Sequence, residues 1–215
     1  MARDYYKTLF VGRSGTGKTY SFRNMDTNST GFVNVENKPL PFKNNFKHHA
    51  RPQTTAQVKE ALGAFATNPE ITCIVIDSFS AYVDILLSEA RTTKRGFDIW
   101  SFYAEEIGKF LNAIKKIDKE IFITAHYEWL QGEEGVKEKR IKVKGREWEG
   151  LVEKEFTIVL YTDNKVDDKG VPKYFFNLFQ ENASTKCPPD IFGANVGTIP
   201  NDAKVVLDKI LEFVK

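Results

Sequence analysis

Cysteine, histidine and long apolar runs are scarce in this chain of 215 residues. Only Cys73 and Cys187 are present, so the sequence can form neither a disulfide framework nor a structural zinc site, and both thiols are expected to be reduced. No stretch reaches the roughly 18 uncharged apolar residues of a membrane span, and the start MARDYYKTLFVG lacks the unbroken apolar core of a signal peptide. We therefore expect a cytoplasmic protein with no membrane partner.

Charge of one sign is also lacking. The chain has 31 Lys and Arg against 29 Asp and Glu, a net charge of +2, and 41% hydrophobic residues. This composition is typical of a globular protein and excludes a disordered one. The overall charge does not by itself indicate nucleic-acid binding, because it hides local clusters. The length suits one domain over residues 1–215.

Short apolar runs alternate with longer segments of helical period, which predicts an α/β fold with a mainly parallel sheet flanked by helices. The predicted strands span residues 6–11, 31–35, 71–76 and 121–125, and the predicted helices span 54–65 and 98–117. After residue 155, two strand-like runs separated by an Asp-Lys-Gly turn predict a C-terminal antiparallel hairpin over about 155–180. A last helix is expected over about 202–214.

The strongest local signal is GRSGTGKT at residues 12–19, between the first predicted strand and a helix expected to begin near Gly17. It fits the phosphate-binding pattern G-x-x-x-x-G-K-[ST], in which backbone amides and a helix N-terminus surround phosphates. Lys18 would contact the β- and γ-phosphates, and the Thr19 hydroxyl would bind Mg²⁺. The predicted nucleotide-binding residues are Gly12, Arg13, Ser14, Gly15, Thr16, Gly17, Lys18, Thr19 and Tyr20.

Three further polar residues end predicted strands, where α/β sheets bind ligands. Asp77 is expected in the Mg²⁺ shell, Glu36 as the base that activates water, and His126 as a sensor of the γ-phosphate. Other readings stay open: Asp77 as a helix cap, Glu36 as a solvated charge and His126 as a structural histidine.

The order of these parts resembles the RecA-like recombinase core. More narrowly, GRSGTGKT, NVENKPLPF, IVIDSFS and ITAHYEW are similar to the short RecA-like P-loop ATPases of bacteriophages, often described as AAA-type nucleotide-binding proteins. Some of those relatives act as single-strand annealing proteins. The resemblance implies ATP and Mg²⁺ as cofactors. RecA-type sensors are commonly Gln, and His126 is closer to the replicative-helicase branch.

RecA-like proteins bind DNA through two loops, which by position would be 88–97 and 127–150. Both segments contain clustered cations, and aromatic residues flank the second one, so phosphate contacts combined with base stacking are chemically available. The alternative is a solvated basic hairpin whose aromatic residues pack inward. The predicted DNA-binding residues are Arg91, Lys94, Arg95, Lys137, Lys139, Arg140, Lys142, Lys144 and Arg146.

The resemblance also implies a homo-oligomer, as a filament or a ring, with ATP sites between subunits. Lys186 is the first candidate for a residue donated to a neighbour's γ-phosphate, and Arg146 and Lys154 are rivals. The function expected is ATP hydrolysis that controls assembly on single-stranded DNA in phage recombination or annealing, with a phage single-strand-binding protein as a further partner. The alternatives are a helicase-like or loader ATPase and a small-molecule kinase. The pattern NKVD at 164–167 is not read as a guanine-specificity motif, because Asp77 is followed by Ser-Phe-Ser in place of a GTPase switch.

Overall fold

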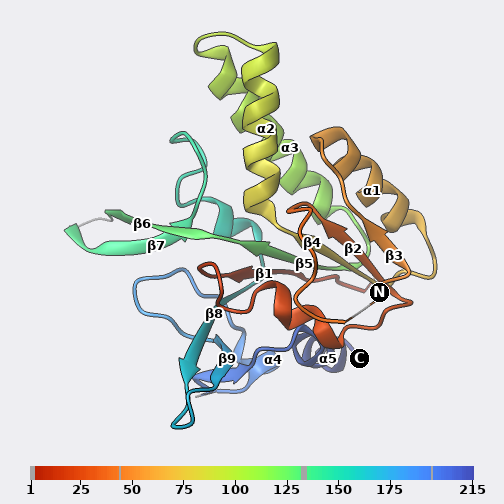
Figure 1. The fold of residues 1–215 in the computed structure, drawn as a ribbon, viewed down its shortest axis with the longest axis vertical. Helices are drawn as coiled ribbons and strands as arrows, with labels where there is room; N and C mark the ends of the chain where they lie inside the picture. Colours follow the sequence, from red (N-terminus) through yellow and green to blue (C-terminus); the bar gives the residue numbers. More distant parts are fainter. Residues whose placement is uncertain (1–2, 44, 132–134, 195) are drawn as a thin grey trace.

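The computed structural model describes residues 3–43, 45–131, 135–194 and 196–215. An eight-stranded sheet in the order β10-β9-β8-β1-β5-β4-β2-β3 forms its centre (Figure 1). The six strands β8, β1, β5, β4, β2 and β3 run parallel to one another. Strand β9 is antiparallel to β8, and β10 is antiparallel to β9. The strands are β1 Lys7–Val11, β2 Thr30–Asn34, β3 His48–Ala50, β4 Cys73–Asp77, β5 Glu120–Ala125, β8 Ile158–Val166, β9 Pro172–Asn177 and β10 Thr198–Pro200.

Three helices cover one face of the sheet: α1 Thr55–Thr67, α2 Phe79–Thr93 and α3 Asp98–Lys115. Alternate strand residues such as Leu9, Ile74 and Ile121 point to this face and are fully buried against helix residues. The Thr54 side chain caps α1 by accepting a hydrogen bond from the Gln57 amide. Within the described residues, no helix is long and apolar enough to cross the lipid bilayer.

The opposite face is covered by shorter elements, namely the 3₁₀-helix η1 Thr19–Asn24, α4 Pro189–Phe192 and α5 Ala203–Phe213. Their core is rich in aromatic residues, with the rings of Phe10 and Phe176 centred 4.4 Å apart. Asp202 caps α5 by accepting a hydrogen bond from the Lys204 amide. The chain therefore buries both faces of its parallel strands, which explains their nearly unbroken apolar runs.

The predicted α/β fold, with a mainly parallel sheet, flanking helices and a C-terminal antiparallel hairpin, is confirmed. The hairpin turn uses Asp167, whose side chain accepts hydrogen bonds from the amides of Lys169 and Val171. Strands β3 and β10 were not predicted, because three residues are too few to carry a periodic pattern.

The segments predicted as DNA-binding loops are more ordered than expected. Residues 88–93 belong to the last turns of α2, so the first loop is limited to residues 94–97. The Ser78 side chain caps this helix by accepting a hydrogen bond from the Ala81 amide. The alternative in which Asp77 is the helix cap is therefore wrong. In the second segment, β6 Tyr127–Gln131 and β7 Lys137–Ile141 pair as an antiparallel hairpin, followed by the 3₁₀-helix η3 Val152–Glu155. Residues 132–134 of that segment lie outside the described residues.

The helix expected to begin near Gly17 is a short 3₁₀-helix that begins at Thr19. Element η1 has six residues of 3₁₀ type, with sequence TYSFRN. Thr, Tyr, Ser and Phe are weak helix formers, and Asp26 then starts a turn by accepting from the amides of Asn28 and Ser29. So short an element has few aligned peptide dipoles, so the partial positive charge expected from a helix end is small here.

Candidate active site

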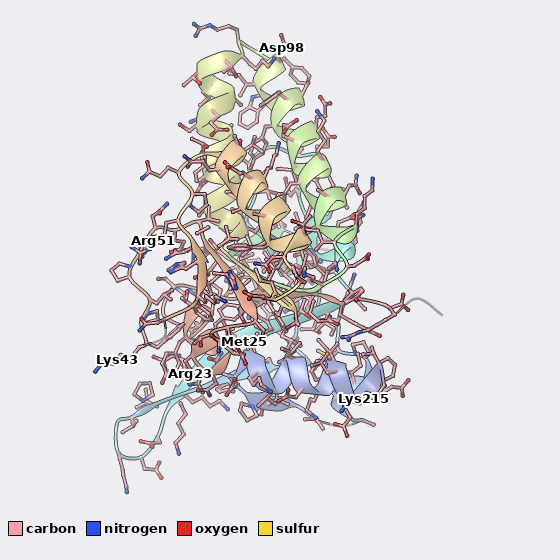
Figure 2. The ribbon with its side chains drawn as sticks, turned by 90° about the vertical axis from the view of Figure 1, so that its right-hand side faces the viewer. Arg23, Met25, Lys43, Arg51, Asp98 and Lys215 are labelled. Carbon is pink, nitrogen blue, oxygen red and sulfur yellow. The ribbon has the colours of Figure 1, made fainter. Side chains whose placement is uncertain are left out.

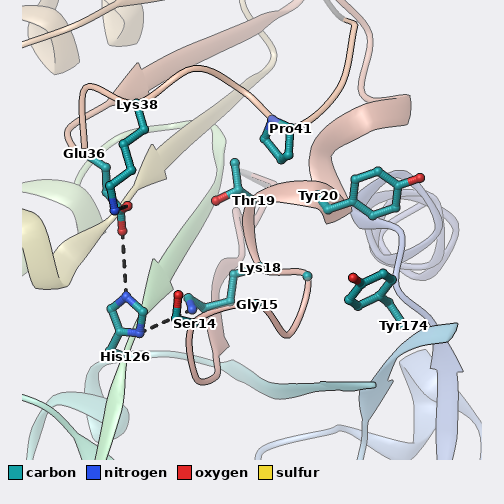
Figure 3. Close-up of a pocket in the computed structure, with 11 residues that line it drawn as sticks. Ser14, Gly15, Lys18, Thr19, Tyr20, Glu36, Lys38, Pro41, His126 and Tyr174 are labelled. Carbon is teal, nitrogen blue, oxygen red and sulfur yellow. Dashed lines mark hydrogen bonds and ion pairs between the residues drawn. The ribbon is translucent and has the colours of Figure 1, made fainter. Parts of the chain in front are cut away.

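A pocket of about 390 Å³ opens at the carboxyl edge of the sheet, directly after β1 (Figure 3). Its walls come from the phosphate-binding loop, from the segment after β2, from the end of β5 and from β9. The lining residues are Ser14, Gly15, Gly17, Lys18, Thr19, Tyr20, Glu36, Lys38, Pro41, His126 and Tyr174. The volume falls within the range typical of small-molecule sites.

The glycines of the loop are required by close contacts. A Cβ atom on Gly12 would lie 2.0 Å from the Thr162 hydroxyl oxygen, and one on Gly17 would lie 2.9 Å from the Tyr174 ring. Gly17 also has a φ of 93°, which side chains other than glycine rarely adopt. The Thr16 and Thr162 hydroxyl oxygens are 2.6 Å apart, so the loop is hydrogen-bonded to β8. The loop thus keeps its backbone close to whatever occupies the pocket.

Lys18 is the buried cation of the pocket. Its Nζ donates hydrogen bonds of 2.9 Å to the carbonyl oxygens of Gly12 and Arg13. Burial lowers the pKa of Lys18 to about 8, although Asp77 and Glu36 act in the opposite direction. A bound polyphosphate would restore full protonation and replace these carbonyl partners with stronger, charge-assisted ones.

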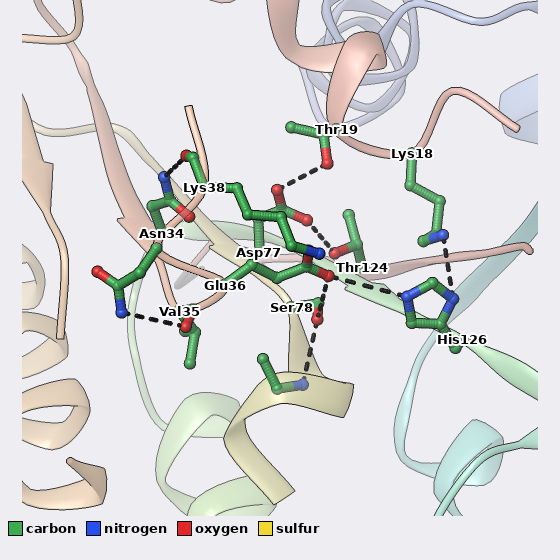
Figure 4. A network of polar contacts seen from close by, with 12 residues as sticks. Lys18, Thr19, Asn34, Val35, Glu36, Lys38, Asp77, Ser78, Thr124 and His126 are labelled. Carbon is green, nitrogen blue, oxygen red and sulfur yellow. Dashed lines mark hydrogen bonds and ion pairs between the residues drawn. The ribbon is translucent and has the colours of Figure 1, made fainter. Parts of the chain in front are cut away.

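Asp77 lies at the end of β4 with both carboxylate oxygens engaged (Figure 4). The Thr19 hydroxyl donates to its Oδ2 at 2.8 Å, and the Thr124 hydroxyl donates to its Oδ1. Burial raises the pKa of Asp77, while these two hydrogen bonds lower it.

The donor set fits Mg²⁺ held partly by substrate. Thr19 and Asp77 present two oxygen ligands side by side, and among the described residues no group of three His, Cys, Asp or Glu side chains could hold a metal alone. Mg²⁺ usually binds one or two protein oxygen ligands and completes its shell with water and substrate phosphate oxygens, so these two ligands suit it.

Glu36 follows β2 and reaches the pocket across the end of β4. Its Oε2 accepts from Lys38 Nζ at 2.7 Å, and its Oε1 accepts from the Ser78 hydroxyl at 3.2 Å. The nearby His126 ring is the largest cause that lowers the pKa of Glu36 to about 2. Burial acts in the opposite direction, and Lys38 and Ser78 lower the pKa further. Glu36 is therefore a carboxylate at neutral pH, which is the state a general base requires.

His126 lies between Lys18 and Glu36. Its Nδ1 is 3.4 Å from Lys18 Nζ, and its Nε2 is 3.8 Å from Glu36 Oε1. Because an ammonium group only donates, Nδ1 accepts and Nε2 carries the ring hydrogen that faces Glu36. The backbone amide of His126 donates to the Ser80 hydroxyl at 2.9 Å, which ties the end of β5 to α2.

Several pocket residues were not anticipated from the sequence. Tyr174 comes from β9, and its ring lies 5.7 Å from the ring of Tyr20, so the two form an aromatic wall with Pro41 nearby. Lys38 is brought in by its ion pair with Glu36. Only the hairpin topology brings Tyr174 to the loop, and no local pattern in the sequence marks it. Thr124, two residues before His126, is the one site residue of this group that the sequence could have indicated. A polar residue within an apolar strand needs a hydrogen-bond partner, and the partner of Thr124 is Asp77.

Lys186, which was predicted to contact a neighbour's γ-phosphate, lies away from the pocket of its own chain. Lys186 bridges to Val159, and its Nζ donates to the Phe156 carbonyl at 3.0 Å. Phe156 precedes β8, so this contact is at the amino edge of the sheet, opposite the pocket. Lys186 therefore takes no part in the pocket of its own chain.

The cations of the β6–β7 hairpin are not equivalent. Lys139 Nζ lies over the rings of Tyr127 and Trp129, both at 5.2 Å, and partial burial lowers its pKa. Arg140 contacts Glu138 and the Ser184 hydroxyl. The exposed members of the predicted set are Arg91, Arg95, Lys137, Lys142, Lys144 and Arg146, while Lys94 is partly buried with its Nζ over Phe102.

The sheet order, the glycine-rich loop and the Thr19–Asp77 pair together define a P-loop nucleotide-binding protein of the α/β class. The profile of the AAA domain family matches residues 4–186, and the chain belongs to that family. Membership indicates nucleotide binding and ATPase activity in general, with Mg²⁺ as the usual metal. No curated protein matches the chain.

Proposed function

We propose that this protein is a Mg²⁺-dependent ATPase whose hydrolysis cycle controls its assembly on single-stranded DNA, in phage recombination or single-strand annealing. One observation carries the proposal: Lys18, Glu36 and His126, which follow three different strands, converge on one pocket beside the Thr19–Asp77 pair. A pocket that only stored a nucleotide would not need an ionised carboxylate beside the phosphate-binding loop.

The proposed hydrolysis divides among these residues. Lys18 and the loop amides would bind the phosphates, and Thr19 with Asp77 would hold Mg²⁺, which would supply positive charge next to the phosphate oxygens. Glu36 accepts the proton of the attacking water, and Ser78 and Lys38 hold the carboxylate in place. His126 links this carboxylate to Lys18, so it is placed to respond to loss of the γ-phosphate.

The DNA part of the proposal depends on the exposed cations around the β6–β7 hairpin. Lys137, Lys142, Lys144 and Arg146 are exposed and follow one another over ten residues. Trp129 is 52% exposed beside them. Cations next to an exposed ring suit a strand of phosphates and unpaired bases.

Oligomer formation is part of the same proposal. The pocket is open on one side, and P-loop enzymes often complete such a site with a cation from a neighbour. Lys186, Arg146 and Lys154 are the candidates, and the assembly would be a filament or a ring. A phage single-strand-binding protein is a further proposed partner.

The decisive experiment measures phosphate release with and without oligothymidylate, at several salt concentrations. We expect DNA to stimulate turnover and the stimulation to fall steeply with salt. Lys18→Ala should abolish turnover, whereas Lys116→Ala, an exposed lysine after α3, should not. Absence of phosphate release under all these conditions would disprove the ATPase, and DNA-independent turnover would disprove the DNA role alone.

A second measurement tests the site of DNA contact. Reversing the charge of Lys137, Lys142 and Lys144 together should weaken DNA binding and flatten its salt dependence. Lys116→Glu is the matched control. Electron microscopy with a non-hydrolysable ATP analogue then separates a filament, expected for a recombinase, from a closed ring, expected for a helicase-like motor.

A further inference from the structure

A second pocket, of about 510 Å³, lies between the first turns of α3 and residues 144–148. It is remote from the phosphate-binding loop in sequence and shares no lining residue with that pocket. Figure 2 shows Asp98, the first residue of α3, at the far end of the projecting α2–α3 hairpin. The lining residues are Phe97, Trp100, Ser101, Tyr103, Ala104, Lys144, Gly145, Arg146, Glu147 and Trp148.

The walls of this pocket are fixed by hydrogen bonds. The Trp148 indole donates from Nε1 to the Ala104 carbonyl at 2.8 Å, and the Tyr103 hydroxyl accepts from the Lys144 amide at 3.2 Å. A Cβ atom on Gly145 would lie 3.4 Å from the Trp100 ring. Two segments that are about 45 residues apart are thereby joined into one preformed aromatic surface.

The rings at the mouth of the pocket are accessible. Phe97 is 79% exposed, and Trp100 is 38% exposed, although both are large apolar residues. Trp100 meets the buried Tyr103 edge to face at 6.4 Å, which holds its ring in place. Exposed, supported aromatic rings beside a cavity indicate a binding site more strongly than scattered surface residues do.

Cations line the pocket and flank it in the sequence. Lys144 and Arg146 are lining residues, and the exposed Arg95 lies two residues before Phe97 in the chain. Throughout the described residues none of these three cations makes an ion pair, so each is available to an anionic ligand. Asp98 and Glu147 are also close, and they partly offset this charge.

We propose that this pocket stacks an unpaired base of single-stranded DNA on Trp100 and Phe97, while Arg95, Lys144 and Arg146 contact the flanking phosphates. The inference rests on the proposed DNA-binding function and assigns it a specific base-binding site. Flat rings between cations match the alternation of base and phosphate along an unpaired strand. An apolar peptide would use the rings and leave the cations without partners.

The test compares two fluorescent oligomers with the same number of phosphates, one of oligothymidylate and one abasic. The protein should bind the base-bearing oligomer more tightly. Phe97→Ala and Trp100→Ala should each weaken that binding by about tenfold and leave binding of the abasic oligomer unchanged. Trp100→Phe should keep most of the affinity, and Phe179→Ala, which removes a ring that is 76% exposed elsewhere, is the matched control.

Intrinsic fluorescence gives an independent reading. Of the three tryptophans, Trp100 and Trp148 line this pocket and Trp129 does not. In a Trp129→Phe background, oligothymidylate should therefore still quench the remaining fluorescence. Thermal melting of each variant checks folding, and Phe97 is exposed enough that its loss should not unfold the chain.

The outcomes separate this inference from the proposed function. If oligothymidylate binds but the two oligomers bind equally, or if Phe97→Ala and Trp100→Ala bind as tightly as the parent, the pocket assignment is wrong and DNA binding stands. If neither oligomer binds, both the DNA role and the pocket fail. Quenching of Trp100 and Trp148 by an apolar peptide, without quenching by the oligonucleotide, would assign the pocket to a protein partner and overturn the proposal.

Discussion

Glu36 Oε1 and His126 Nε2 lie 3.8 Å apart, although β4 separates the strands that precede them. The contact crosses the carboxyl edge of the sheet above Ser78, the residue that caps α2. A water molecule bound beside Glu36 would therefore share its surroundings with the imidazole, and the carboxylate and the ring should contribute to catalysis together.

Glu36→Gln should retain ATP binding and slow hydrolysis on the order of a hundredfold or more. The amide keeps the size of the side chain and its hydrogen bond from Ser78, but it does not accept a proton from water. Single-turnover phosphate release and equilibrium binding of a fluorescent ATP analogue measure the two effects. Glu60→Gln, an exposed residue of α1, is the control, and near-normal turnover by the Glu36 variant would remove the base assignment.

His126→Ala should make ATP turnover more sensitive to acid. The nearby His126 ring is the largest cause that holds the pKa of Glu36 at about 2, so Glu36 stays ionised as the pH falls from 7 to about 4. Without the ring, the pKa of Glu36 should rise towards its ordinary value of 4.5, and part of the carboxylate is then protonated in that range.

The dependence of kcat on pH checks this expectation. The acid limb of the His126→Ala variant should lie at higher pH than that of the parent protein. The same sign applies to stability: a lowered pKa stabilises the fold above the unfolded value and loses that effect as the pH falls towards 2. Identical acid limbs in the two proteins would show that His126 does not control Glu36.

Gly12→Ala should disturb the phosphate-binding loop without touching the nucleotide directly. The added Cβ would lie 2.0 Å from the Thr162 hydroxyl and 2.5 Å from the Thr16 hydroxyl, so the loop must move away from β8. Such overpacking costs about 1–3 kcal/mol of stability, and ATP affinity should fall with it. Gly63→Ala in α1 has no atom within 4 Å of its new Cβ and should instead raise the free energy of unfolding by about 0.5–1 kcal/mol. Denaturant titrations of both variants test the contrast.

Neither cysteine should react readily in the folded protein. Burial raises the pKa of Cys187 to about 12 and raises the pKa of the fully buried Cys73 well above its ordinary value. Because the thiolate is the reactive form, iodoacetamide at pH 8 should modify the native chain slowly and the denatured chain twice. Mass spectrometry counts the adducts, and fast modification of Cys187 in the native state would show that its surroundings open easily.

The positions of the main site residues followed from the sequence because local rules fix them. An apolar strand followed by GRSGTGKT defines the loop by itself, and polar residues that end parallel strands meet at one edge whatever the strand order. Glu36, Asp77 and His126 are therefore found together, although the sequence does not reveal that β5 separates β1 from β4.

Other features depend on contacts that no local pattern encodes. Tyr174 reaches Gly17 only because β9 folds back along β8. The apolar residues at helical spacing in α3 predict core packing, and Tyr103 is buried as expected. This spacing does not reveal that Trp100 remains at the surface, next to residues 144–148. The β6–β7 hairpin was considered only as an alternative to a DNA-binding loop, because its second strand, KEKRI, contains charges where a strand pattern needs apolar residues.

The hydrogen bond between Thr16 and Thr162 has a further consequence. Strand β8 runs from beneath the phosphate-binding loop into the free turn at residues 167–170, and β9 returns from that turn to place Tyr174 against Gly17. The ribbon of two strands thus holds the loop at two points and ends in solvent. Any displacement of the outer turn would therefore be transmitted to the phosphate-binding loop through both contacts.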